Sequence, residues 1–198
     1  MTDIGRELLG RARDLHSEAT DLLRTGGLLS AIEAFGDVRV GGSWALGLMT
    51  RPEIDLYLKL DNERDTARFF AVGAALVASY RVVRAAYSNH FTRGLPGFAS
   101  GLFWGVSIDY AGRRWKVDLW GEGPEPFAEH QAAFDVLAQA LRNVAPENVL
   151  GLKEAYREGD GYRDGVTGLA IYRASLAGAR DVEGFLAWRR RAQSEGEP

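Results

Sequence analysis

The stretch Gly41-Gly42-Ser43-Trp44-Ala45-Leu46-Gly47, followed by Arg51-Pro52-Glu53-Ile54-Asp55-Leu56-Tyr57-Leu58, decides the fold of this chain. Its glycines and serine predict a tight turn that leads into a short helix. The residues after Pro52 alternate between polar and apolar types, which predicts a half-buried strand over residues 53–60. Because side chains two positions apart share a face of a strand, Glu53 and Asp55 should point the same way.

A third carboxylate lies inside a later apolar segment, Lys116-Val117-Asp118-Leu119-Trp120. This segment follows Leu102 to Tyr110 after the short turn Ala111-Gly112-Arg113-Arg114, so the two segments predict an antiparallel hairpin. A carboxylate inside an apolar strand is costly unless it is paired, hydrogen-bonded or metal-bound. If the strands that carry Asp55 and Asp118 are neighbours, three carboxylates converge.

The strand pattern alone leaves two interpretations open. The carboxylates could bind a metal, because magnesium prefers oxygen ligands and carboxylates two residues apart on a strand can share ions. Alternatively, they could lie on a solvated sheet face, paired with Lys59, Lys116 or a nearby arginine. The glycine-serine turn favours the first interpretation, because its glycines allow close approach of the backbone and its amides and hydroxyl can hold phosphate.

The composition fits one domain, or one domain with a helical appendage. The chain has 198 residues, of which 46% are hydrophobic and 26% charged, so it can build an ordinary core. A net charge of -3 argues against a surface that wraps nucleic acid, although a local basic groove stays compatible with it. Nucleic acid is therefore not the expected partner.

Several classes of site are excluded by the residue types present. The chain has no cysteine, so disulfides, zinc–thiolate sites and thiol nucleophiles are ruled out. No Gly-x-Ser-x-Gly elbow surrounds Ser43, which argues against a serine hydrolase. No signal peptide or membrane-spanning run is visible, so we expect a cytoplasmic protein without a membrane partner.

The remaining elements are predicted from periodicity, caps and turn residues. We expect a boundary near Gly121, giving a domain over residues 1–121 with N-terminal helices and a helical C-terminal region over 122–198. Residues 88–97 are expected to form a loop that could lie over the site. Its His90 could act as an acid or base, but loop histidines are usually exposed, so an exposed side chain is expected. The expected helices are 3–23, 28–35, one capped by Asp61 or Asn62 and running to 79, 126–143, 146–157, 164–177 and 181–192, and the further strands are 38–40 and 80–87.

Taken together, the three motifs resemble the nucleotidyltransferase superfamily of the DNA polymerase beta type. Val40-Gly41-Gly42-Ser43 matches its glycine-serine turn, Glu53-Ile54-Asp55-Leu56 its carboxylate pair, and Val117-Asp118-Leu119 its third carboxylate. Within the superfamily the chain looks most like small bacterial aminoglycoside and lincosamide nucleotidyltransferase-like proteins. The resemblance implies an α/β (strictly α+β) fold, in which a small, mixed, twisted sheet with flanking helices is followed by a helical C-terminal region.

The resemblance also implies a chemistry. A nucleoside monophosphate group would pass from a nucleoside triphosphate, with ATP the first choice, to a hydroxyl of a small-molecule acceptor, with Mg²⁺ or Mn²⁺ as cofactor. The metal and catalytic ligands would be Glu53, Asp55 and Asp118. Gly42 and Ser43 would bind the triphosphate, and Lys153, placed at the opening of a helix, would reach the triphosphate or the acceptor.

One position departs from the family pattern. Glu53 stands where aspartate is usual, and in another register Asp55-Leu56-Tyr57 would be the motif, with Tyr57 in place of a ligand. The alternative is therefore a catalytically impaired protein of this fold that binds a nucleotide or a partner protein. The antitoxin half of a toxin–antitoxin pair is a third option, which the helical extension disfavours. Arg51 and Lys59 are expected to be solvated surface residues, and His130 has no evident partner.

Overall fold

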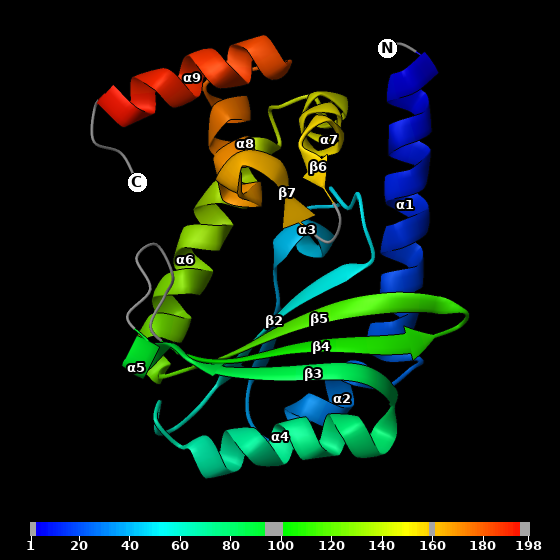
Figure 1. Ribbon diagram of the computed structural model, residues 1–198, viewed down its shortest axis with the longest axis vertical. Coiled ribbons are helices and arrows are strands. Elements are labelled where there is room, and N and C mark those ends of the chain that lie inside the picture. The colour runs from blue at the N-terminus through cyan, green and yellow to red at the C-terminus, as the bar shows by residue number, and fades with distance from the viewer. Residues whose placement is uncertain (1–2, 94–100, 159–160, 195–198) are drawn as a thin grey trace.

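The computed structural model describes residues 3–93, 101–158 and 161–194. Figure 1 shows a twisted sheet with α2 and α4 below it, α6 to α9 above it and α1 along one side. In chain order the elements are α1 (Asp3–Arg24), α2 (Leu28–Glu33), β1 (Val38–Val40), α3 (Gly42–Ala45), β2 (Glu53–Lys59), α4 (Thr66–Ser79), β3 (Arg81–Asn89), α5 (His90–Arg93), β4 (Leu102–Tyr110), β5 (Arg113–Glu122), α6 (Pro124–Leu141), α7 (Pro146–Ala155), β6 (Arg157–Glu158), β7 (Gly161–Tyr162), the 3₁₀ helix η1 (Arg163–Gly165), α8 (Gly168–Leu176) and α9 (Val182–Ser194).

The main sheet has five strands in the order β1-β2-β5-β4-β3. β2 and β5 run parallel, and the other neighbouring pairs run antiparallel. The predicted hairpin is present as β4 and β5, joined at Ala111 and Gly112, which both have positive φ. The expected α/β architecture with a small mixed sheet and flanking helices is therefore confirmed.

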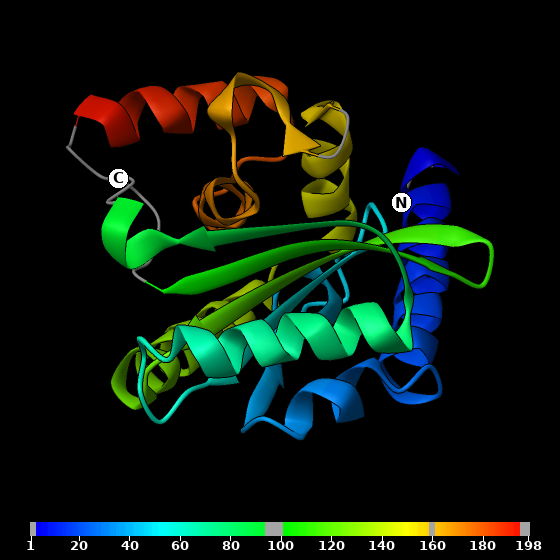
Figure 2. The same cartoon turned by 60° about the horizontal axis from the view of Figure 1, so that its bottom comes forward.

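One face of this sheet is the core of the molecule. Ile54, Leu56 and Leu58 of β2 are fully buried on it, as are alternate residues of β4 and β5. Helices α2 and α4 cover this face, as the rotated view in Figure 2 also shows. The opposite face carries Glu53, Asp55 and Asp118, because the strand alternation places them there.

The buried hydrophobic residues form two clusters. The first packs the sheet against α1, α2 and α4, and the second is built around α7, α8 and α9. Helix α1 contributes to both, since Ala12 belongs to the second cluster and Leu15 to the first. The division near Gly121 stays a prediction. Among the described helices, none combines the length and apolar character needed to cross a membrane.

Two predicted helix starts are wrong. Helix α4 begins at Thr66, because the side chain of Asp65 accepts a hydrogen bond from the backbone of Arg68 and caps the first turn. Asn62, expected as a cap, instead accepts from the backbone of Arg64 in a turn. The helix expected from Asp164 begins at Gly168, because Asp164 and Gly165 both have positive φ and cannot continue a right-handed helix.

The loop predicted over residues 88–97 is wrong in its first part, residues 88–93. Strand β3 continues to Asn89 and helix α5 follows, while residues 94–100 lie outside the described part of the chain. His90 is buried, with 8% of its surface exposed, and its ring packs against Phe103 and Trp120. The expectation of an exposed loop histidine is therefore wrong, because the side chain lies against the aromatic residues of β4 and β5.

Candidate active site at the junction of two parallel strands

The register of the two central strands brings the predicted carboxylates together. Asp55 of β2 lies directly opposite Asp118 of β5, and Glu53 lies opposite Lys116. Neighbouring strands are about 4.8 Å apart, so Asp55 and Asp118 are adjacent on one face of the sheet. Asp118, which is more than sixty residues from Glu53 and Asp55 in the sequence, thus lies in one small area with them.

The glycine-serine turn lies directly over Asp55. The amide of Gly41 donates to the backbone oxygen of Asp55 at 2.9 Å. Gly42 has φ +58, and a Cβ built there would lie 1.8 Å from Oδ2 of Asp55. Only glycine fits this position, since any side chain would collide with the carboxylate and strain the backbone. Ser43, in α3, is buried, with 8% of its surface exposed.

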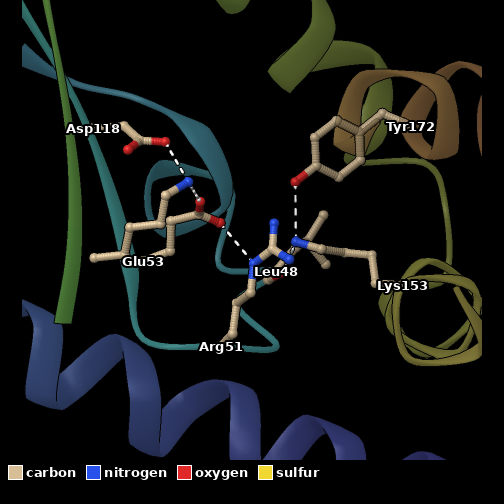
Figure 3. Close-up of polar contacts among 7 residues, drawn as sticks. Leu48, Arg51, Glu53, Asp118, Lys153 and Tyr172 are labelled. Carbon is tan, nitrogen blue, oxygen red and sulfur yellow. Dashed lines mark hydrogen bonds and ion pairs between the residues drawn. The ribbon is translucent and has the colours of Figure 1, made fainter. Parts of the chain in front are cut away.

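Two cations bind two of the three carboxylates, those of Glu53 and Asp118 (Figure 3). The ammonium of Lys116 donates to Oε1 of Glu53 and to Oδ2 of Asp118, at 2.7 Å in each case. Arg51 donates from Nε to Oε2 of Glu53 at 2.7 Å, and its guanidinium stacks on the ring of Tyr162. Arg51 is therefore part of the site, and the expectation of a solvated surface residue is wrong. Lys59 instead pairs with Asp37, away from the carboxylates.

The three carboxyl groups have different electrostatic environments. Burial, together with the charges of Glu53 and Asp118, raises the pKa of Asp55 to about 7. Burial also raises the pKa of Asp118 above its ordinary value, and Lys116 only partly opposes this. For Glu53, burial would raise the pKa, but Lys116 and Arg51 more than offset it and lower the pKa. Glu53 therefore stays ionised where Asp55 readily takes a proton.

Lys153 reaches the same site from the helical region. It lies in the last turn of α7, not at the opening of the helix as expected, and only 2% of its surface is exposed. Its ammonium donates to the backbone oxygen of Leu48 at 2.6 Å and to the hydroxyl of Tyr172 at 3.2 Å (Figure 3). Burial, with Arg51 nearby, lowers the pKa of Lys153 to about 8.

Carboxylate oxygens are suitable ligands for a divalent metal, but those of Glu53 and Asp118 are paired with Lys116 in the structure. Oδ1 of Asp118 is buried and has no hydrogen-bond partner among the described residues, which leaves an oxygen for a further ligand. Within the same described ranges, no three Asp, Glu or His side chains are arranged so that they could hold a metal ion as they stand. The ammonium of Lys116 instead bridges Glu53 and Asp118.

Two hollows lie near the site, and Glu53 and Asp118 line one of them. One, of about 890 Å³, lies beside Glu53, Lys116 and Asp118, between α1 and the open face of the sheet. The other, of about 420 Å³, is mainly apolar and lies between Tyr57 and α6. His130 lines this second hollow and pairs through Nδ1 with Glu122 at 2.7 Å, so its predicted lack of a partner is wrong.

Some of these residues could have been found from the sequence. Lys116 lies two positions before Asp118, so strand alternation already places the two side chains on one face. Arg51 lies two positions before Glu53, but Pro52 interrupts the alternation there. The pairing of His130 with Glu122 joins a strand end to a helix, and no local pattern signals it.

Comparison with known proteins identifies the fold. The non-canonical poly(A) polymerase complex GLD-2–GLD-3 resembles the chain with 16% identity and a TM-score of 0.55, and the match covers 88% of this chain and 57% of that one. The GLD-2/RNP-8 complex has 14% identity and a TM-score of 0.52, with 85% of this chain and 64% of that one covered. A cytoplasmic RNA terminal U-transferase has 11% identity and a TM-score of 0.50, with 85% of this chain and 52% of that one covered. This chain thus has the nucleotidyltransferase fold. It spans between about half and two thirds of their length. No family model and no curated protein matches it.

Proposed function

We propose that the chain is a nucleotidyltransferase, which moves a nucleoside monophosphate group from a nucleoside triphosphate to a hydroxyl of an acceptor. One observation carries the proposal: the parallel register of β2 and β5 sets Asp55 opposite Asp118, directly under the turn at Gly42. The fold, and the activity of the solved proteins that share it, support the same class of reaction.

The triphosphate would bind on the side of the turn and the helical region. Gly42 allows the backbone to approach, and the hydroxyl of Ser43 is a further hydrogen-bond donor there. Lys153 and Arg51 supply positive charge close to Asp55. Nη1 of Arg51 is buried and has no hydrogen-bond partner among the described residues, so this guanidinium retains a donor for a phosphate oxygen.

Glu53, Asp55 and Asp118 would hold magnesium or manganese. When bound, such an ion positions the triphosphate and neutralises charge that develops around the reacting phosphorus. Lys116 would have to release at least one of its two carboxylates to the metal, because its ammonium lies between them. Glu53 in place of aspartate keeps its charge and stays ionised, so it remains a usable ligand.

Asp118 is placed to accept the proton of the acceptor. Its carboxylate borders the larger hollow, and its raised pKa makes it a better proton acceptor than an ordinary aspartate. In the proposed reaction the acceptor oxygen bonds to the α-phosphorus, the bond from that phosphorus to the bridging oxygen breaks, and pyrophosphate leaves. The hydroxyl proton passes to Asp118.

A second function is favoured by the contacts of Lys116. A protein that has an internal cation between two of its carboxylates could bind a nucleotide without transferring it. Such a module would keep its nucleotide affinity when Asp118 is neutralised, whereas a transferase would lose transfer. The two functions therefore differ in what Asp118→Asn does.

The test has a binding arm and a transfer arm. Wild type, Asp55→Asn and the surface control Asp61→Asn would be melted with ATP, GTP, CTP or UTP, with and without magnesium or manganese. Ligand at about 100 times its dissociation constant adds roughly 2.7 kcal/mol, enough to shift the melting temperature by several degrees. A metal-dependent shift in wild type and control that is lost in Asp55→Asn supports the site.

The transfer arm uses nucleotide labelled on the α-phosphate. Label that is transferred by wild type and lost in Asp118→Asn, which still binds nucleotide, identifies a transferase. Binding that survives in both proteins without transfer would leave the non-catalytic module. No shift with any nucleotide contradicts both functions.

A further inference from the structure

The larger hollow beside Asp118 is a basic groove. Of the nineteen residues that line it, seven are arginine or lysine and four are aspartate or glutamate. The whole chain has the opposite balance, with a net charge of -3. Positive charge is therefore concentrated in this groove, next to the carboxylate assigned above to the acceptor.

The floor of the groove is made of small residues. Gly105 of β4 lies opposite Asp118, and Ala86 of β3 lies opposite Gly105. One step along the strands, Ser107 lies opposite Lys116. A Cβ built on Gly105 would come within 3.8 Å of Oδ1 of Asp118. Because these positions carry little side-chain volume, a trough crosses β3 and β4 and runs up to Asp118. At its end the ring of Phe103 lies over Gly105, 3.2 Å from the position of that Cβ.

Arginines line the trough beyond the carboxylates. Arg84, opposite Ser107, is exposed and has no ion pair among the described residues. Arg114, near the start of β5, pairs within the described part of the chain only with the partly exposed Asp109. On the other wall, Arg11 and Arg157 share the single carboxylate of Glu154 at 3.4 and 3.5 Å. The guanidinium groups therefore outnumber the carboxylates that neutralise them.

Aromatic side chains border the trough on its other side. Phe103 lies opposite Trp120, one step along the strands from Asp118, and the two rings are 4.8 Å apart between centroids. Phe103 lines the groove and is only partly buried. Basic grooves that also present aromatic rings are typical of proteins that bind single-stranded nucleic acid, because the bases stack on the rings.

We infer that the groove binds a single-stranded nucleic acid, whose terminal hydroxyl lies at Asp118 and whose phosphates contact Arg84 and Arg114. This inference rests on the proposed function and names its acceptor. It replaces the small-molecule acceptor expected from the sequence, since a polycationic aminoglycoside would be repelled here. Arg114 is four residues before Asp118, about 13 Å along the strand. A chain spans this distance, whereas a small phosphorylated molecule does not.

The experiment measures binding of a fluorescein-labelled 15-nucleotide RNA to the full chain, by anisotropy, over a range of salt concentrations. The matching DNA is measured in parallel. The variants are Arg84→Glu, Arg114→Glu and their combination, with Arg190→Glu on α9 as the matched control. Arg190 is also an exposed arginine, and it lies in a different region of the fold. Arg84→Glu removes no ion pair seen in the described residues, so it should fold normally, and a thermal melt checks this.

We expect the double variant to bind the RNA at least about tenfold more weakly, with Arg190→Glu close to wild type. For these two phosphate contacts, log K against log salt should have a slope of about -1.4 in wild type, reduced in magnitude by roughly 0.7 for each arginine lost. Preference for RNA over DNA, or equal binding of both, identifies the kind of strand within the inferred class.

Three results would overturn the inference. One is RNA binding that the groove variants leave unchanged. Another is displacement of the RNA by tripolyphosphate at an equal concentration of phosphate groups, which would reveal a general anion site. The third is binding of the aminoglycoside kanamycin in the groove, strengthened by Arg84→Glu. Nucleotide-dependent melting, measured on the same samples, separates the two proposals: a nucleotide shift without RNA binding refutes the acceptor class and leaves the transferase standing.

Discussion

Lys116 lies two residues before Asp118 on β5, and its ammonium binds the carboxylate of Asp118 and that of Glu53 at the same distance, 2.7 Å. Burial would lower the pKa of Lys116, but the two carboxylates raise it to about 12. The lysine therefore remains charged and compensates the carboxylates when no metal is bound. In this state the site is closed by a protein cation, which any metal must displace.

Replacing Lys116 with methionine should lower the stability of the metal-free protein and raise its affinity for a metal ion. The loss leaves Glu53 and Asp118 without their shared cation, at a cost of about 1–2 kcal/mol once the partial exposure of Lys116 is taken into account. Manganese titration, followed by calorimetry or by electron paramagnetic resonance, should show tighter binding in Lys116→Met than in wild type. Unchanged manganese affinity would mean that Lys116 does not compete with the metal.

Asp55 should make the metal-free protein less stable as the pH rises. Its pKa in the folded state, about 7, lies above the ordinary value of 3.8, so the folded state holds the proton more tightly than the unfolded state. The free energy of unfolding should therefore decrease from about pH 4 to about pH 7 and level off above that. Urea denaturation in the presence of a chelator should show this decrease in wild type and a smaller one in Asp55→Asn.

Asp118 and Glu53 also contribute to the pH dependence of the free energy of unfolding. Both residues are present in wild type and in Asp55→Asn, so the difference between these two proteins reports on Asp55. The raised pKa of Asp118 acts in the same direction as that of Asp55. The lowered pKa of Glu53 acts in the opposite direction, because its stabilisation is present above the unfolded pKa and is lost as the pH falls. If the free energy of unfolding decreases equally with pH in wild type and in Asp55→Asn, Asp55 is not the group that titrates.

Gly42→Ala should disable the site. The new Cβ would overlap Oδ2 of Asp55, and the positive φ would add strain, so we expect a loss of about 1–3 kcal/mol in stability and of nucleotide binding. Gly47→Ala is the matched control, because Gly47 also has positive φ, +67, but open space around its Cβ position. If both variants lose the same stability and both still bind nucleotide, the contact with Asp55 is unimportant.

Lys153→Met should abolish the nucleotide-dependent rise in melting temperature. The methionine keeps most of the buried volume but removes the ammonium, and it leaves the carbonyl of Leu48 without its donor at a cost of about 1–3 kcal/mol. Tyr172→Phe removes only the hydroxyl at the other end of the contact and should retain the nucleotide effect. Loss of the effect in Tyr172→Phe as well would point to packing rather than to the charge of Lys153.

The fold was largely predictable because its signals are local. Strand alternation around Asp55, the turn at Ala111-Gly112 and the apolar periodicity of the helices each depend on residues close together in the sequence. The caps were less predictable, since Asp61, Asn62 and Asp65 are all suitable cap residues and only the path of the chain selects Asp65. The positive φ at Asp164 likewise became evident only in the structure.

The site was predictable in its carboxylates but not in its cations. Alternation and the resemblance pointed to Glu53, Asp55 and Asp118, while the contact between Lys116 and Glu53 depends on the register of two strands that are distant in sequence. The basic groove was equally hidden, because Arg11, Arg84 and Arg157 come from three separate elements. Net charge reports the sum over the chain and cannot show where the charges gather.

Helix α1 takes part in both hydrophobic clusters and so connects two walls, the sheet and the helical region of α7 to α9. Ala12 is packed with the helical region, whereas Leu15, less than one turn further on, is packed with the sheet. A rigid hinge motion that separated the walls would have to pull one of these residues out of its cluster. The first helix of the chain therefore resists separation of the two walls.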